Sequence, residues 1–176
     1  MWPAYGAEEI RIGEHLVTIV VDVANVMGSR PDGWWRDRAG AAVRLHAEVV
    51  RLAASGRAIL PDDPGAPGQA GQPGRPAGPG RPAGPSQPGF VMVLEGAARA
   101  AAARISAADP TEVPVRPGEV RVVQARGSGD DAIVAVVRAL PGRRVVVTAD
   151  RELRERCVAA GATLLGPGWL LGLLGD

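Results

Sequence analysis

The chain has 176 residues, enough for one domain with a hydrophobic core of ordinary size. Its net charge is +1, so no overall positive field argues for nucleic-acid binding, and aromatic residues make up only 3%, so the core must be aliphatic. All 20 basic residues are arginines. The absence of lysine excludes a Walker phosphate-binding loop, Schiff-base catalysis and a receiver-type phosphoacceptor site, because each of these needs a lysine amine.

The single cysteine, Cys157, permits no disulfide within the chain and indicates a reducing compartment. One cysteine and two histidines, His15 and His46, do not suffice for a zinc site. No basic segment followed by a long apolar run opens the chain, and no apolar run is long enough to span a bilayer. We therefore expect a cytoplasmic protein that does not contact a membrane.

The first half of the chain predicts a leader at 1–15 and a buried parallel strand at 16–22. A loop follows, and apolar residues at helical spacing predict a helix over 36–55 that ends at Gly56. Residues 61–89 are more than half proline and glycine. This composition predicts a disordered loop inserted between a helix and a strand, and the loop could bind a protein partner.

In the second half of the chain, predicted strands alternate with predicted helices. The strands are expected at 90–95, 120–125, 144–149 and 162–165. The helices are expected at 97–105, 130–139 and 151–160, and a turn or helix follows from Gly168. This alternation predicts the α/β class, with one three-layer domain over 1–176 and a mostly parallel central sheet of about five strands. Right-handed crossovers would place the carboxyl ends of all the strands on one edge, where such sheets bind ligands.

Acidic residues stand at the ends of four predicted strands. Asp22 ends the first strand, Glu95 the second and Asp150 the fourth, and Asp130 and Asp131 follow the third. Carboxylates that gather on one edge raise each other's pKa or bind a cation, and hard oxygen ligands select Mg²⁺ or Mn²⁺. We predict that the metal ligands come from these five residues, and that only one of the two adjacent aspartates contacts the metal directly.

Each acid also has a purely structural alternative. Asp22 could cap the following loop, Ser128 or Asp130 could cap the next helix, Asp150 could be a helix N-cap, and Glu95 could simply precede a turn. Because one aspartate is enough for capping, the paired aspartates favour a second role.

Further polar residues stand near these acids. Asn25 and Thr148 are predicted to orient water or the acids. Several residues are predicted to contact phosphate groups of a substrate: Arg30, Arg126, Ser128 and Arg151. Trp34 and Trp35 stand beside arginines, including Arg36 and Arg38, and could stack unpaired bases, although at least one of them should pack against the protein.

Two other phosphate chemistries fit the sequence poorly. The string GSGDDA at 127–132 satisfies the dinucleotide pattern G-x-G-x-x-A, but two carboxylates at the start of a helix would repel a pyrophosphate. A haloacid-dehalogenase-type phosphatase is disfavoured because Ala24 stands where that family has its second aspartate.

The strings VVDVANV, GSGDDAIV and VVVTADRELRERCVAAGA resemble the PIN-like nuclease superfamily, in particular its NYN branch. The resemblance covers nearly the whole chain apart from the leader and the insertion. It implies a PIN-like fold and an acidic divalent-metal site that cleaves RNA. The family builds this site from an Asp-x-x-Asn motif, a central Asp-Asp pair and a late Thr/Ser-x-Asp motif.

The matching residues are Asp22 with Asn25, Asp130 with Asp131, and Thr148 with Asp150. The first motif departs from the commoner form, since Val23 and Ala24 stand where the family often has a glycine. The helix after the first strand often supplies a further acid in such nucleases, and the residues available there are Asp37 and Glu48.

The segment WWRDRAGA and the ending GPGW also resemble actinobacterial proteins labelled nucleoside-triphosphate pyrophosphohydrolases. Known pyrophosphohydrolases use helix-borne E-x-x-E pairs, and the chain has no convincing set of them. We therefore expect Mg²⁺- or Mn²⁺-dependent phosphodiester hydrolysis, with single-stranded or structured RNA as the substrate. The alternatives are a small-molecule nucleotide or phosphoester hydrolase and a catalytically silent RNA-binding module. A homodimer and a toxin–antitoxin role stay open.

Overall fold

The computed structural model describes residues 16–58, 60–61, 87–105 and 115–175. The predicted leader at 1–15 lies outside the described residues, and so does the predicted insertion apart from residue 61 and residues 87–89. Among the described residues, no helix is long and apolar enough to cross a membrane.

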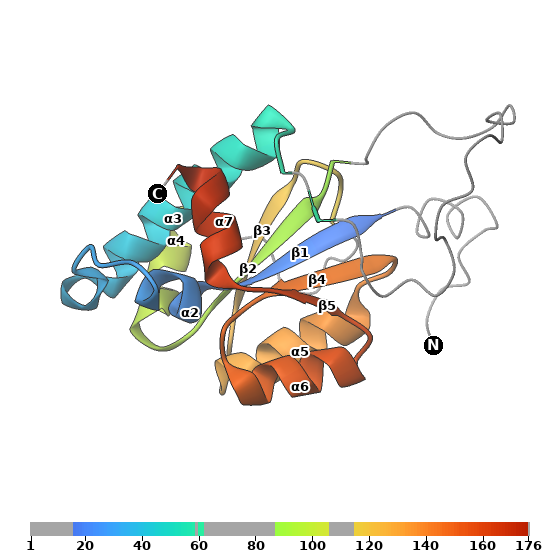
Figure 1. Ribbon diagram of the computed structural model, residues 1–176. Helices are drawn as coiled ribbons and strands as arrows, with labels where there is room; N and C mark the ends of the chain where they lie inside the picture. Colours follow the sequence, from blue (N-terminus) through green and yellow to red (C-terminus); the bar gives the residue numbers. More distant parts are fainter. Residues whose placement is uncertain (1–15, 59, 62–86, 106–114, 176) are drawn as a thin grey trace, which may run out of the picture.

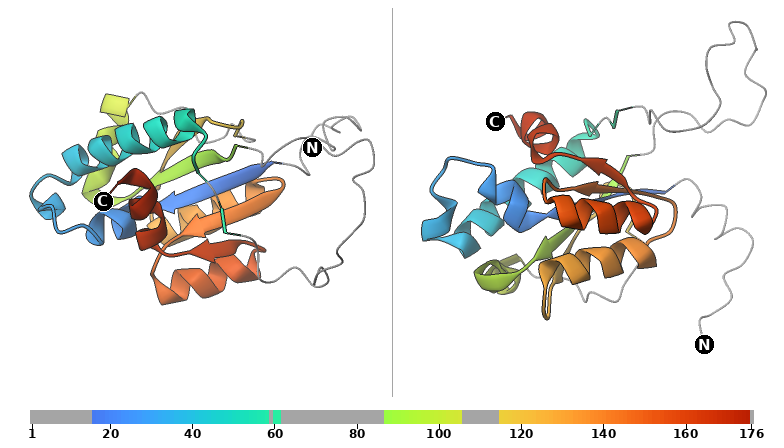
Figure 2. Two further views of the ribbon diagram at one scale, coloured as in Figure 1. Left: turned by 45° about the horizontal axis from the view of Figure 1, so that its top comes forward. Right: turned by 60° about the horizontal axis from the view of Figure 1, so that its bottom comes forward.

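The described residues form one parallel sheet with the strand order β3-β2-β1-β4-β5. The strands are β1 (Val17–Asp22), β2 (Gly89–Leu94), β3 (Val120–Gln124), β4 (Arg143–Val147) and β5 (Thr163–Leu165). Every neighbouring pair runs parallel, so all carboxyl ends lie on one edge (Figures 1 and 2). The predicted α/β class and five-stranded sheet are confirmed.

Helices cover both faces of the sheet, in the three layers that the sequence predicts (Figure 1). One layer contains α2 (Val23–Gly28), α3 (Arg38–Ser55), α4 (Ala102–Ile105) and α7 (Pro167–Leu174). The other layer contains α5 (Gly129–Ala139) and α6 (Arg151–Ala159). Short 3-10 helices precede α3 at Trp34–Arg36 and α4 at Gly96–Ala101.

The strands are buried on both sides, which explains their nearly continuous apolar sequences. In β1, Ile19 and Val21 belong to the core cluster under α3, and Val20 belongs to the cluster under α5 and α6. The same alternation in β2 and β4 leaves very few polar side chains inside the described part of the chain. Its buried polar or charged residues are Thr18, Asp22 and Thr148.

The structure corrects the sequence prediction at four places. The segment after Asp22 is the short helix α2 and not a loop, because Val23, Val26 and Met27 fall at helical spacing and are buried. The helix predicted over 36–55 begins only at Arg38. The helix predicted over 97–105 is largely a 3-10 helix, with α-helix only at its end. The strand predicted to end at Glu95 stops one residue earlier, so Glu95 lies just beyond the sheet.

Candidate active site

Asp22 is the buried acid at the centre of the carboxyl edge. It ends β1, the middle strand, and is only 7% exposed. One of its carboxylate oxygens accepts the Asn25 backbone N–H at 3.1 Å, and the other accepts the Thr148 hydroxyl at 2.8 Å. The first bond caps α2, so the structural alternative is also true, yet both bonds leave acceptor capacity on the carboxylate.

Asn25 lies in α2 and joins the ends of two strands. Its side-chain Oδ1 accepts the Ala149 backbone N–H at 2.9 Å, 124 residues away in sequence. The side chain therefore holds the turn that leads from β4 to Asp150, while Asp22 is held by the backbone of Asn25. The predicted side-chain hydrogen bond from Asn25 to Asp22 is therefore replaced by the backbone bond, and the Asn25 side chain holds the turn before Asp150 instead.

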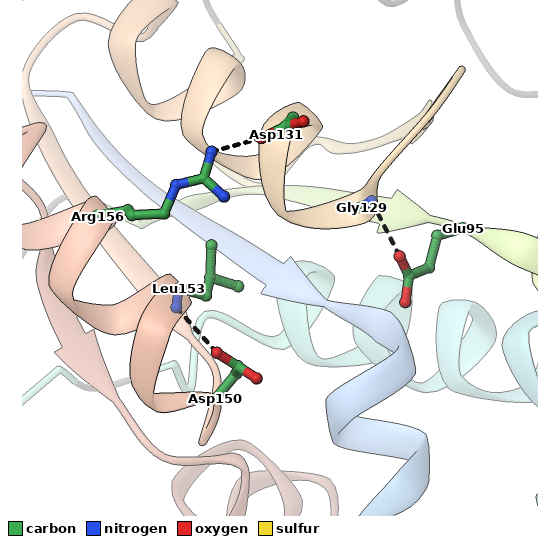
Figure 3. Close-up of polar contacts among 6 residues, drawn as sticks. All are labelled: Glu95, Gly129, Asp131, Asp150, Leu153 and Arg156. Atoms are coloured by element: carbon green, nitrogen blue, oxygen red, sulfur yellow. Dashed lines mark hydrogen bonds and ion pairs between the residues drawn. The ribbon is translucent and has the colours of Figure 1, made fainter.

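Thr148 and Asp150 complete this set of hydrogen bonds. The Thr148 hydroxyl donates to Asp22 and accepts the Asp150 backbone N–H at 3.1 Å. One Asp150 oxygen accepts the Leu153 N–H at 2.9 Å and caps α6 (Figure 3). Arg154 adds a bond to the Thr148 carbonyl at 3.0 Å. A single connected network thus fixes the ends of β1 and β4 relative to each other.

Glu95 reaches the start of α5 from the neighbouring strand. One of its carboxylate oxygens accepts the Gly129 N–H at 3.0 Å (Figure 3). A Cβ at position 129 would lie 2.0 Å from that oxygen, so this approach requires a glycine. Ser128 occupies the N-cap position but makes no side-chain capping bond, so Glu95 supplies the acceptor that the sequence predicted from Ser128 or Asp130.

The adjacent aspartates of α5 lie in different surroundings. Asp131 pairs with Arg156 of α6, with Arg156 Nη2 2.5 Å from Asp131 Oδ1, and its side chain is 71% exposed (Figure 3). Asp130 is half-buried, and its electrostatic neighbours include Asp150 and Glu95. Of the pair, Asp130 is the one that belongs with the acids of the edge.

The electrostatics of the edge join four carboxylates. Burial raises the pKa of Asp22 above its ordinary value, the bonds from Asn25 and Thr148 oppose this, and the charges of Glu95 and Asp130 add to the rise. Burial also raises the pKa of Asp130, and the charges of Asp150 and Glu95 raise it further. These acids come from the ends of four different strands and lie close enough for their negative charges to interact.

The predicted phosphate contacts differ in how accessible they are. Arg126 and Ser128 are exposed before α5, and Arg151 is 94% exposed at the first position of α6, 3.5 Å from Glu155. Arg30 instead lies 2.7 Å from Glu48, with only 9% of its side chain exposed. A role for Arg30 on substrate would need this pair to open.

Two further acids that the family resemblance suggested are used elsewhere. Asp37 caps α3 by accepting the Gly40 N–H at 2.8 Å, and Glu48 pairs with Arg30. Neither is among the groups that shift the pKa of Asp22 or Asp130. Burial raises the pKa of the Cys157 thiol to about 11, which keeps it protonated at neutral pH and unsuited to nucleophilic catalysis.

Sequence reasoning missed Arg154 and Arg156. Both lie in the run RELRER, where a cluster of arginines after a candidate acid was the available signal. That signal does not say that Arg154 would reach back to Thr148 and Arg156 across to α5. The first contact joins α6 to the end of the strand just before it, and the second depends on how α6 packs beside α5.

Whether the edge suits a metal depends on donor chemistry and on spacing. The donors are hard carboxylate oxygens, which suit Mg²⁺ or Mn²⁺, and burial together with the neighbouring carboxylates raises the pKa of Asp22 and of Asp130. Within the described ranges, however, no three or more His, Cys, Asp or Glu side chains are already grouped so that they could hold one ion. The chemistry fits a divalent cation, and small movements of side chains would have to complete the site.

Comparisons with known proteins give one result on the fold. No protein-family model and no curated protein matches the sequence. The crystal structure of a mutant of Rae1 (YacP) from Bacillus subtilis is similar, with a TM-score of 0.53 over 90% of this chain and 75% of that chain. At 13% identity the likeness shows the fold alone, and this fold is PIN-like, as the sequence predicted.

Proposed function

We propose that the protein is a divalent-metal-dependent phosphodiesterase whose substrate is RNA. The observation that carries this proposal is the convergence of Asp22, Glu95, Asp130 and Asp150 on the carboxyl edge, where the charges of Glu95 and Asp130 add to the raised pKa of Asp22 and those of Asp150 and Glu95 add to the raised pKa of Asp130. Such an edge is where open α/β sheets bind ligands. The fold shared with Rae1 (YacP) agrees with the PIN-like resemblance of the motifs.

The cation would be Mg²⁺ or Mn²⁺, held by Asp22 and Asp130 with Asp150 or Glu95. When bound, such a cation supplies Lewis acidity, which makes a water more acidic and stabilises charge on the phosphoryl oxygens. Asp22 is the fixed member of this set, because the Thr148 hydroxyl and the Asn25 N–H orient its two oxygens. Asp150 and Glu95 each use one carboxylate oxygen to accept a hydrogen bond from a backbone N–H.

The remaining residues would position rather than react. Asn25 holds the turn before Asp150, and Thr148 couples that turn to Asp22. Arg126 and Arg151 are exposed before α5 and at the start of α6, where they would contact the phosphates flanking the cleaved bond. Asp131, committed to Arg156, would serve the packing of α5 against α6.

The test is cleavage of labelled single-stranded RNA by purified protein with Mn²⁺, compared with EDTA and with Asp150→Asn. Asparagine also caps helices, so this variant removes the charge while α6 keeps its cap. Asp37→Asn is the matched control, because Asp37 is likewise an N-cap aspartate but its charge is not among those that shift the pKa of Asp22 or Asp130. We expect cleavage by the wild type and by Asp37→Asn, and none with EDTA or with Asp150→Asn.

Other results would discriminate the alternatives. Cleavage that persists in Asp150→Asn would contradict the site. A nucleoside triphosphate run in parallel and hydrolysed alone would point to a small-molecule hydrolase. RNA binding that survives EDTA without any turnover would point to a silent RNA-binding module.

A further inference from the structure

An exposed tryptophan stands out on the surface of the described part of the chain. The large hydrophobic side chains exposed there are Trp35, Val50 and Val158, and Trp35 is the aromatic one, with 56% of its surface exposed. An exposed indole ring offers a large, rigid, planar face on which another ring can stack. The roles proposed above for the acids, Asn25, Thr148 and the arginines do not use it.

The segment that carries Trp35 is built and held in place. Trp34, its neighbour, is half-buried and packs against the core under α3, and the two rings meet edge to face with their centroids 6.3 Å apart. Asp32 accepts the Trp34 N–H at 3.0 Å, and Gly33 turns the chain with a φ of 76°. Trp34 therefore serves as the buttress, and Trp35 is the exposed ring that it supports.

The topology places this pair on the same edge as the acids. β1 ends at Asp22, α2 follows directly, and the tryptophans lie between α2 and the start of α3, which runs back along the sheet (Figure 1). The six residues of α2 span only about 9 Å at 1.5 Å per residue. The segment thus begins close to Asp22, within reach of one strand of a nucleic acid bound there.

Two arginines beside the pair are suited to contact phosphates. Arg36 and Arg38 are exposed on either side of Asp37, and the Arg38 guanidinium lies 5.2 Å from the centroid of the Trp34 ring. The two carboxylates of the segment, Asp32 and Asp37, each accept a backbone N–H, so both are held against the backbone of the segment. An aromatic face beside arginines is the combination with which proteins bind single-stranded nucleic acid.

We infer that Trp35 is a stacking platform for an unpaired base of a single-stranded RNA whose backbone crosses the acidic edge. The inference rests on the proposed function and specifies its substrate class, since a duplex offers no exposed base face to such a platform. Trp35 binds and positions the strand and takes no part in the chemistry.

The experiment measures binding of a short fluorescein-labelled oligoadenylate in EDTA, so that cleavage plays no part. The proteins are the wild type, Trp35→Ala, Trp35→Phe and Val158→Ala. Val158 is the matched control because it is also 56% exposed but lies near the end of α6 that is remote from the acids. An oligomer of the same length without bases serves as the second probe, and thermal melts check that every variant is folded.

Stacking predicts that Trp35→Ala weakens oligoadenylate binding roughly 5- to 100-fold, as loss of one base–aromatic stack does. Trp35→Phe should restore part of the affinity, and Val158→Ala should bind as the wild type does. The oligomer without bases should not distinguish Trp35→Ala from the wild type. This last comparison separates loss of stacking from general damage to the surface.

Equal binding of oligoadenylate by the wild type and Trp35→Ala, or an equal loss on the oligomer without bases, would overturn the inference. So would dissociation of an oligomer by Trp35→Ala with RNA binding unchanged, because the ring would then cover a second copy of the chain. Base-dependent binding without RNA cleavage in Mn²⁺ would keep the platform and reject the nuclease. RNA cleavage at the same rate by the wild type and Trp35→Ala would keep the nuclease and reject the platform.

Discussion

The acidic edge has two halves that hold their carboxylates differently. At the ends of β1 and β4, Asp22, Thr148 and Asp150 belong to one connected hydrogen-bond network that Asn25 closes. At the ends of β2 and β3, within the described residues, Glu95 makes one hydrogen bond to the start of α5, and Asp130 interacts with its neighbours electrostatically and without a hydrogen bond from its side chain. The first half is preorganised and the second is pliable, so a cation would mainly have to move Glu95 and Asp130.

The largest effect should separate the two aspartates of the pliable half. We expect Asp130→Asn to lower Mn²⁺-dependent RNA cleavage roughly 100-fold or more, the scale on which the loss of one electrostatic contact to a transition state acts. Asp131→Asn should stay within about threefold of the wild type, because an exposed ion pair contributes little. Single-turnover cleavage rates measure both, and the opposite ranking would show that Asp131 is the functional member.

The preorganised half should depend on the Thr148 hydroxyl. Thr148→Val leaves an Asp22 oxygen and the Asp150 N–H without a partner in a buried place, so the free energy of unfolding should fall by about 1–3 kcal/mol. Thr148→Ser keeps the hydroxyl and should recover most of this stability. Urea unfolding measures both variants. A fully stable Thr148→Val would mean that the network is not what holds the two strand ends.

Asp22 itself should limit stability at neutral pH. Its pKa is raised in the folded state, so the folded state binds the proton more tightly than the unfolded state does. The stability it contributes is present below the ordinary pKa of 3.8 and is lost as the pH rises through the raised value. Asp22→Asn cannot ionise and should be more stable at pH 7 by about 1 kcal/mol, a gain typical of functional sites.

Urea titrations over a pH series test this sign. The advantage of Asp22→Asn should shrink as the pH falls toward the ordinary value for aspartate. An advantage that grows in acid would mean that the ionised carboxylate is favoured by its hydrogen bonds over the cost of burial.

The smallest effect concerns the hydrogen bond between the Glu95 carboxylate and the Gly129 N–H in the pliable half. Gly129→Ala would push the Glu95 carboxylate away from the Gly129 N–H, and the lost bond should lower the free energy of unfolding by about 0.5 kcal/mol. Gly127→Ala is the control, because no atom lies within 4 Å of a Cβ at that position. Thermal melts compare the two. Equal melting temperatures would indicate that Glu95 finds another partner at no cost.

The sequence predicted the elements along the chain because hydrophobic periodicity is a local property. Apolar runs such as VTIVVD and RVVVT are too apolar for a surface strand, and their ends identify Asp22 and Asp150 directly. The helix α2 was missed because the turn signals at Gly28, Pro31 and Gly33 concealed six residues whose helix is fixed by burial and by the Asp22 cap. The start of α3 was misplaced because Asp37 is the N-cap, so the helix begins at Arg38, two residues beyond its predicted start.

What the sequence determined by itself was therefore the α/β class, the parallel strands and the edge on which the acids end. Only the tertiary structure decided which acids meet. The strand order places β1 between β2 and β4. The packing of α6 beside α5 pairs Asp131 with Arg156, while Asp130 lies with the acids of the carboxyl edge. Asp130 and Asp131 are the same residue type in the same local sequence, so local signals do not tell them apart. What each side chain contacts depends on neighbours that are distant in sequence.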